Sequence, residues 1–259
     1  MNETVQIRVH GEASLPTLIY LPGLHGDWTL IGGFRAALGG RCRFVELCYP
    51  EGSSPSLAGI AEEIVKQLQH LGITRAWLLG ESFGSQVAWE IIRQTSDGTH
   101  LFEPQGLILA GGFVRHPLPW GVRLFRRLSI AMPLWLLKLL CWLYLKYAAV
   151  RHPGASEKSS DLRQFAVNRC QAVGRQGIAH RYGLIATNDP REQASKTRLP
   201  VYYLAGFFDP LVPCPFIRLW LRRNCPGYRA GKTFWLADHG VLISAPGETA
   251  SQVLLWMKT

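Results

Sequence analysis

Residues 80–84 read Gly-Glu-Ser-Phe-Gly and directly follow the apolar residues 76–79. A strand that ends in Gly-x-Ser-x-Gly and turns at once into a helix forms a nucleophile elbow, whose strained turn holds the serine hydroxyl clear of the sheet. The pattern therefore predicts that Ser82 is a nucleophile. On its own it is weakly specific, because the chain has 26 glycines in 259 residues and short glycine patterns recur by chance.

A nucleophilic serine needs a base to take its proton and a third group to orient that base. Where this elbow occurs, the order along the chain is Ser, then Asp or Glu, then His, each at the end of a strand. Asp209 follows the apolar segment 201–205, and His239 follows the apolar segment 233–236. We therefore expect Asp209 to orient His239 and His239 to take the proton of Ser82.

Other titratable residues fit these roles less well. Asp238 is next to His239 in sequence and so points elsewhere, which favours a role in the turn. No carboxylate follows the predicted strand that ends at Ala110, and we expect Glu81 to make structural hydrogen bonds. The remaining histidines are expected to be ordinary surface or cap residues: His10, His70, His100, His116, His152 and His180.

An acyl-transfer site also needs N–H donors for the oxyanion. One is expected from the backbone of Phe83, the residue after the nucleophile. The second is expected from Leu24, in the Pro-Gly-Leu-His-Gly loop after the first apolar strand. His25 in this loop is predicted to line the pocket rather than transfer protons. Gly23 and Gly26 are the other pocket candidates, and Gly26 is expected to allow close approach of substrate.

Strand-like and helix-like segments alternate along most of the chain, which is typical of a parallel sheet with crossover helices. The predicted strands are 17–21, 43–49, 76–79, 106–110, 201–205 and 233–236. The predicted helices are 29–38, 56–71, a helix from the elbow to residue 93, and 249–257.

Residues 114–200 interrupt this alternation and are too long for a connecting loop. Within them, residues 120–150 are rich in Leu, Trp and Tyr and are predicted to be helical. No acidic residue lies between Glu103 and Glu157, whereas seven basic residues do. They are Arg115, Arg123, Arg126, Arg127, Lys138, Lys146 and Arg151.

A transmembrane helix does not fit this segment. Pro133, Lys138 and Lys146 divide the apolar run into stretches shorter than the ~20 residues of a membrane span. A helical cap over the active site explains the segment better. Such a cap packs against its own core, or part of it touches a lipid surface, since basic, Trp-rich amphipathic helices lie at bilayer interfaces.

The net charge of +10 and the pI near 9.6 raise the question of nucleic-acid binding. The basic residues do not form a run with interleaved stacking aromatics, and many fall in the apolar segment just described. The sequence therefore argues against a nucleic-acid partner.

The six cysteines show neither a CxxC pair nor an interleaved histidine spacing. We expect free thiols in a reducing cytosol and no metal site; a disulfide between Cys214 and Cys225 is the less favoured alternative. The first residues show no secretory signal, so we expect a cytoplasmic protein, with peripheral membrane association as the variant.

These motifs together resemble the α/β-hydrolase superfamily over nearly the whole chain. The resemblance is greatest to a bacterial carboxylesterase-like group whose loop reads Leu-Pro-Gly-hydrophobic-Asp-Gly and whose elbow reads Gly-Glu-Ser-Phe; here His25 replaces the loop Asp. The motifs that carry the resemblance are Leu21-Pro22-Gly23-Leu24, Gly80-Glu81-Ser82-Phe83-Gly84, Gly206-x-x-Asp209-x-x-Val212-Pro213 and Asp238-His239-Gly240.

The resemblance implies an α/β-hydrolase fold, with a mostly parallel sheet flanked by helices and a helical cap inserted after the strand that follows the elbow. Residues 1–113 and 200–259 then form the core domain and residues 114–199 the cap. The leading antiparallel strands of the fold are expected to be reduced to residues 5–9.

The expected activity is that of a serine esterase without metal or organic cofactor, acting through an acyl-enzyme on small esters with hydrophobic acyl groups of short to medium length. One alternative is a thioesterase or acyltransferase, whose basic surface attracts an acidic acyl carrier protein or the phosphates of a CoA thioester. Another is a non-catalytic binding or membrane-docking protein on the same scaffold. The oligomeric state stays open.

Overall fold

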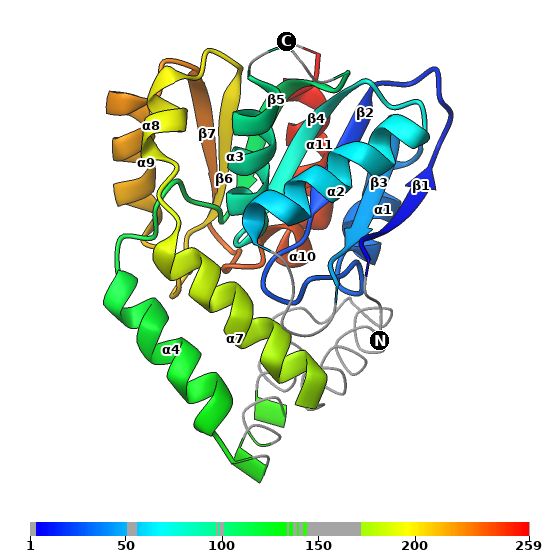
Figure 1. Cartoon of the computed structure of the whole chain (residues 1–259). Helices are drawn as coiled ribbons and strands as arrows, with labels where there is room; N and C mark the ends of the chain where they lie inside the picture. Colours follow the sequence, from blue (N-terminus) through cyan, green and yellow to red (C-terminus); the bar gives the residue numbers. More distant parts are fainter. Residues whose placement is uncertain are drawn as a thin grey trace.

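The computed structural model describes residues 4–50, 56–96, 98, 101–133, 135, 136, 139, 142, 143 and 172–258. The strands are β1 Gln6–His10, β2 Thr17–Leu21, β3 Arg43–Cys48, β4 Arg75–Glu81, β5 Glu103–Ala110, β6 Val201–Gly206 and β7 Tyr228–Phe234. Within the described residues they form one sheet in the order β1-β3-β2-β4-β5-β6-β7 (Figure 1). β1 is antiparallel to β3, and all other neighbouring pairs are parallel, as the sequence predicts.

Helices flank both faces of this sheet. The helices of the described residues are α1 Gly32–Leu38, α2 Leu57–His70, α3 Gly84–Thr95, α4 Pro119–Ala131, α7 Ala172–Thr187, α8 Arg191–Lys196, α9 Cys214–Asn224, α10 Val241–Ser244 and α11 Pro246–Trp256, of which α4 and α7 do not cover a face of the sheet. On one face Leu78 of β4 packs in a buried cluster with Ile64 of α2, and on the other its neighbour Leu79 packs with Phe34 of α1. The central strand is therefore buried on both sides, which explains its uninterrupted apolar sequence.

The sequence of α2 shows why these crossover helices form where they do. The side-chain oxygen of Ser56 accepts a hydrogen bond from the N–H of Gly59 at 3.2 Å and so caps the first turn. Ile60, Ile64 and Leu68 follow at intervals of four residues, and all three are buried. An apolar row at this spacing turns one face of the helix toward the sheet.

The last strand corrects one prediction. β7 ends at Phe234, so of the predicted strand 233–236 only Thr233 and Phe234 belong to it; Trp235 and Leu236 lie beyond it and are 68% and 80% exposed. Trp235 makes a surface contact instead, in which the centroid of its ring lies 4.4 Å from that of Phe207. Phe234 is buried in the core, whereas Trp235 and Leu236 are apolar without being part of it.

α4 and α7 lie beyond the end of the sheet where the parallel strands finish, with α7 between α4 and the strands (Figure 1). They follow β5 in the chain, where the cap is expected. The predicted cap boundaries, 114–199, include residues outside the described ones and stay a prediction. Among the described residues, no helix combines the length and the apolar character needed to cross a bilayer.

Replacing Ile64 by Ala tests the packing between α2 and the sheet. Ile64 is fully buried, so we expect Ile64→Ala to lower the free energy of unfolding by about 2–5 kcal/mol, through lost burial and a residual cavity. Urea denaturation measures the change. Glu62→Ala is the matched control, because Glu62 lies on the exposed side of the same helix. Equal effects of the two substitutions would contradict the packing described here.

Candidate active site

Ser82 lies in a left-handed turn between β4 and α3. Its φ is +48°, and no other non-glycine residue in the described part of the chain has a positive φ. Such a conformation costs about 1–3 kcal/mol and persists only where the surroundings hold it. The neighbouring glycine is essential, because a Cβ on Gly84 would lie 2.0 Å from the carbonyl oxygen of Leu21. Ser82 is only 7% exposed, so its hydroxyl is held inside the protein rather than in open solvent.

The three residues predicted to act together meet at this turn. His239, which follows β7, places Nε2 3.0 Å from Oγ of Ser82. Its Nδ1 lies 2.8 Å from Oδ2 of Asp209, which follows β6. A carboxylate only accepts hydrogen bonds, so Nδ1 carries the proton and Nε2 is left to accept from the Ser82 hydroxyl. This is the arrangement in which histidine serves as a base toward serine.

The carboxylate of Asp209 is fixed from both sides. Its Oδ1 accepts the backbone N–H groups of Leu211 and Val212, each at 2.9 Å, while Oδ2 accepts from His239. The side chain is 1% exposed. Burial by itself would raise the pKa of Asp209, but the hydrogen bond from His239 and these backbone donors outweigh it and lower the pKa. Asp209 therefore stays ionised beside the histidine.

His239 shows the opposite balance. Burial alone would lower the pKa of His239, but the hydrogen bond to Asp209 and the charges of Asp209, Glu81 and Asp238 outweigh it and raise the pKa. The protonated imidazole is thus stabilised in this site. A histidine with a raised pKa is a stronger base and favours transfer of a proton from a serine hydroxyl.

Two backbone N–H groups near Ser82 remain available to a ligand. Within the described residues, neither the N–H of Leu24 nor that of Phe83 donates a hydrogen bond. A Cβ on Gly23 would lie 3.5 Å from Cβ of Ser82, so the loop that carries Leu24 runs directly past the serine. This geometry agrees with the oxyanion donors predicted from the sequence.

Beneath the serine lies a buried polar network that sequence reasoning only partly anticipated. Glu81 accepts a short hydrogen bond from the hydroxyl of Tyr20. Nε2 of His25 lies 3.2 Å from the same hydroxyl, and because the tyrosine proton is given to Glu81, the imidazole is the donor in that contact. Burial and the charge of Glu81 raise the pKa of Tyr20 well above its ordinary value, which keeps the phenol a donor. Tyr20 gave no signal, since it reads as one apolar position in a strand.

The pocket candidates of the oxyanion loop have different surroundings from one another. The ring of His25 lies 3.4 Å from where a Cβ on Gly23 would stand, and that position is 3.5 Å from Cβ of Ser82; the place of both residues in a substrate pocket stays a prediction. Gly26 does not leave space for substrate, because a Cβ there would lie 2.4 Å from the guanidinium of Arg181. The glycine at this position, with φ of +80°, accommodates the arginine instead.

Arg181 is a site residue that sequence reasoning missed. It projects from α7, is 7% exposed, and donates to the carbonyl oxygens of Leu24 at 2.9 Å and His25 at 3.5 Å. These contacts hold the peptide units of the oxyanion loop from outside. No local pattern predicts them, because Arg181 is 157 residues from Leu24 in the sequence.

His116, one of the histidines expected to be ordinary surface or cap residues, has a more specific place. Nδ1 of His116 accepts the N–H of Leu118 at 3.2 Å, so its Nε2 is the donor to the carbonyl oxygen of Leu211 at 3.3 Å. His116 thereby braces the loop that carries Asp209. Burial lowers the pKa of His116, in keeping with a neutral ring.

The other assignments are simpler. Asp238 accepts the N–H of Gly240 at 3.0 Å, which is the turn role predicted for it. Cys214 and Cys225 are free thiols, so the alternative disulfide is not formed. His100 and His152 lie outside the described residues.

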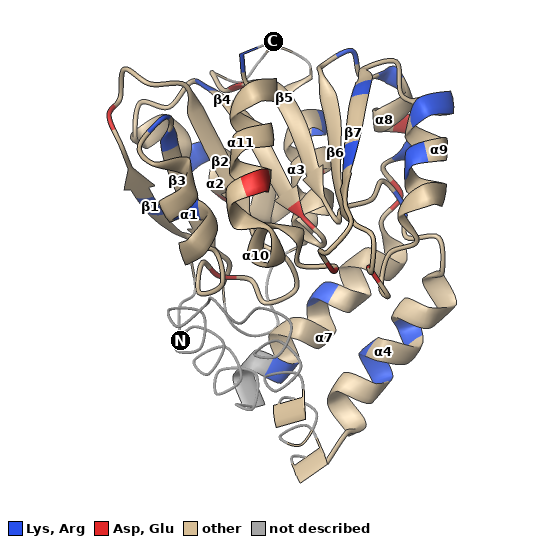
Figure 2. Ribbon diagram, turned by 180° about the vertical axis from the view of Figure 1, so that it is seen from behind, with Lys and Arg blue, Asp and Glu red and all other residues tan. Residues whose placement is uncertain are grey.

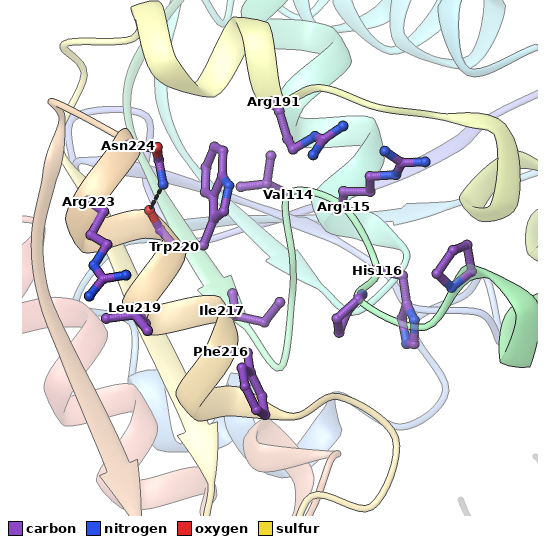
Figure 3. Close-up of a pocket in the computed structure, with 12 residues that line it drawn as sticks. Val114, Arg115, His116, Arg191, Phe216, Ile217, Leu219, Trp220, Arg223 and Asn224 are labelled. Carbon is purple, nitrogen blue, oxygen red and sulfur yellow. Dashed lines mark hydrogen bonds between the residues drawn. The ribbon is translucent and has the colours of Figure 1, made fainter.

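A separate cavity of about 570 Å³ lies between α9 and the segment that leads into α4 (Figure 3). Its wall includes His116, Trp220 and Phe216, but none of the three residues of the hydrogen-bonded site. Arg115 and Arg191, which also line it, are both paired with Asp189. None of the residues that line the cavity is a Ser, Cys or Thr, so Ser82 remains the candidate nucleophile. Among the described residues, no group of three or more His, Cys, Asp and Glu side chains is arranged to hold a metal ion.

No protein-family model and no curated protein sequence matches the chain. Solved structures do. A hydrolase from Pseudomonas aeruginosa is similar with a TM-score of 0.78 and 18% identity, over 98% of this chain and 94% of that one. An esterase from Exiguobacterium antarcticum has a TM-score of 0.77 and 17% identity, over 98% and 96%. An enol-lactonase from Burkholderia xenovorans has a TM-score of 0.76 and 18% identity, over 98% and 96%. These likenesses confirm the α/β-hydrolase fold.

The electrostatic link between Asp209 and His239 is testable on its own. We expect Asp209→Asn to lower the pKa of His239 by about one to three pKa units, because an adjacent carboxylate that favours the imidazolium is removed. NMR titration of the imidazole measures the change. Asp238→Asn is the control, because Asp238 contributes least of the groups that raise this pKa. A larger change from Asp238→Asn would contradict the assigned pairing.

Proposed function

We propose that this α/β-hydrolase-fold protein is a serine hydrolase that cleaves carboxylic esters with hydrophobic acyl groups of short to medium length. The observation that carries the proposal is the hydrogen-bonded series from Ser82 through His239 to Asp209, at 3.0 and 2.8 Å. The low exposure of Ser82 and its strained backbone support a chemical role, since such strain is retained where a site uses it.

The geometry defines the steps. As Ser82 Oγ attacks the ester carbonyl carbon, its proton passes to Nε2 of His239, and the carbonyl oxygen becomes an oxyanion held by the N–H groups of Leu24 and Phe83. The bond to the alkoxy oxygen then breaks, and His239 gives that oxygen its proton, which leaves an acyl-enzyme. Water attacks the acyl carbon, His239 takes the water proton, and the carboxylic acid leaves as the proton returns to Ser82. Asp209 remains ionised throughout.

The surroundings of the acid favour an apolar substrate. Phe207, Phe208 and Leu211 flank Asp209 and are 52%, 50% and 46% exposed. Exposed aromatic and aliphatic side chains that neighbour the acid in the chain are suited to an apolar acyl or alkyl group.

The esterase from E. antarcticum supports ester hydrolysis by analogy of fold. The enol-lactonase with the same fold shows why that analogy alone does not select the substrate.

Thioesters are the second substrate class for the same residues. The net charge of +10 favours an acidic carrier protein or the phosphates of a CoA thioester as partner. We rank oxygen esters above thioesters because the residues at Ser82 require only a reactive carbonyl group in the substrate. They do not require a carrier.

Removing the nucleophile tests the proposal. We expect Ser82→Ala to lower kcat on p-nitrophenyl esters by about 10⁴- to 10⁶-fold, because no other group forms the acyl-enzyme. Wild type and variant are compared over acyl chains from acetate to palmitate, with the unfolding midpoint as a check on folding. Ser251→Ala, an exposed serine on α11, is the matched control. A Ser82→Ala variant that retained most of the turnover would refute the assignment. Turnover of acyl-CoA thioesters without turnover of oxygen esters would replace the first substrate class by the second.

The acid limb of the pH profile is a second test. His239 must be neutral to accept the proton of Ser82, and its pKa is raised above the ordinary 6.5. Activity is therefore lost as the pH falls through a midpoint above 6.5. We expect kcat/KM for a p-nitrophenyl ester, followed from about pH 5 to about pH 9, to show this midpoint. A flat profile, or a midpoint below 6.5, would exclude His239 as the base in this form.

A further inference from the structure

The side of α4 turned away from α7 carries an exposed apolar row. Trp120, Leu124 and Leu128 are spaced by four residues and therefore share one face of the helix; they are 65%, 48% and 41% exposed. The packed side of α4 is different, because Val122 is buried and Phe125 stacks on Tyr182 of α7, with ring centroids 6.3 Å apart. An amphipathic helix ordinarily hides its apolar face, so this outward row needs a partner.

The same helix is strongly basic. Arg123, Arg126 and Arg127 are exposed, and within the described residues none of them has an ion pair. Figure 2 shows basic and no acidic positions along α4. In the sequence, no acidic residue occurs from 104 to 156. Within the described part of the chain, no ion pair therefore compensates the positive charge of α4.

Beyond α4, Trp135, Leu139 and Trp142 are 68%, 43% and 53% exposed. Tryptophan is enriched where protein meets the headgroup region of a bilayer, and exposed Arg is attracted to anionic lipid. The surface of α4 combines both features, and Figure 1 shows no strand or helix of the core on its outer side.

We propose that the outer row of α4, Trp120, Leu124 and Leu128, is a docking surface for an anionic lipid bilayer, with Arg123 and Arg127 contacting lipid phosphates. A second copy of the chain is a poorer partner for this face, because two such surfaces would bring uncompensated arginines together. A nucleic acid would neutralise the arginines but leave the apolar row exposed. A bilayer interface satisfies both components. Binding to lipid is independent of the ester chemistry proposed above.

The test is sedimentation of the full chain with phosphatidylcholine vesicles, with and without phosphatidylserine. We expect wild type to bind the phosphatidylserine vesicles. The charge variant Arg123→Glu/Arg127→Glu and the apolar variant Trp120→Ala/Leu124→Ser should each weaken this binding about tenfold or more, since each interfacial basic residue and each buried apolar group contributes to it.

Matched controls distinguish binding through this surface from non-specific adsorption to vesicles. Lys66→Glu/Lys258→Glu makes the same charge change at exposed positions elsewhere, and Leu101→Ser/Leu255→Ser removes two side chains that are 75% and 58% exposed. Both controls should bind within about twofold of wild type. Unfolding midpoints and hydrolysis of a soluble ester should be unchanged in the α4 variants, which excludes misfolding.

Three outcomes would overturn the proposal: no binding to anionic vesicles, equal loss in the controls, or binding that does not respond to Arg123→Glu/Arg127→Glu. If the protein bound duplex DNA but not vesicles, and the charge variant lost the DNA binding, the face would be assigned to a nucleic acid instead. Vesicle binding by a protein without ester turnover would leave the docking surface standing and refute only the proposed hydrolysis.

Discussion

The left-handed turn at Ser82 is the constraint on which the rest of the site depends. At φ of +48°, the chain reverses from β4 into α3 so tightly that Gly84 abuts the carbonyl oxygen of Leu21. This contact exists only because β2 and β4 are parallel neighbours in the sheet. The end of β2 therefore delivers the Leu24 loop to the serine, and one close approach positions both the hydroxyl and its predicted oxyanion donors.

Two charged side chains hold that loop. Glu81 accepts a hydrogen bond from the hydroxyl of Tyr20, and the oxygen of that hydroxyl accepts one from His25. Arg181 of α7 donates to the carbonyl oxygens of Leu24 and His25. Both contacts involve nearly buried groups, where hydrogen bonds with a charged partner are strong. The histidine that replaces the loop aspartate of the resembling group is therefore an integral part of this chain's own network.

The sequence predicted those parts of the site whose signals are local. Ser82 directly follows β4, and Asp209 and His239 lie in the loops after β6 and β7; parallel strands bring these ends to one edge of the sheet. Tyr20 and Arg181 were missed because they reach the site only through the three-dimensional fold. Such contacts produce no recognisable spacing in the sequence. His116 was grouped with the ordinary surface or cap residues for the same reason, although it braces the Asp209 loop. Trp235 misled the assignment of the last strand because hydrophobicity was taken as burial, whereas its ring contacts Phe207 at the surface.

The electrostatics of the site set a balance between the stabilisation of the imidazolium of His239 and the pH range in which the histidine is neutral. Asp209, Glu81 and Asp238 all favour the protonated form of His239, so the imidazolium formed when Ser82 gives up its proton is stabilised against burial. The same charges keep the resting histidine protonated up to a higher pH. While it is protonated, it cannot act as a base. In the proposed reaction, the arrangement therefore stabilises the charge that develops on His239 and lowers activity in acid. Of the three carboxylates, only Asp209 is hydrogen-bonded to the imidazole, so it alone also fixes the proton on Nδ1 and leaves Nε2 directed at the serine.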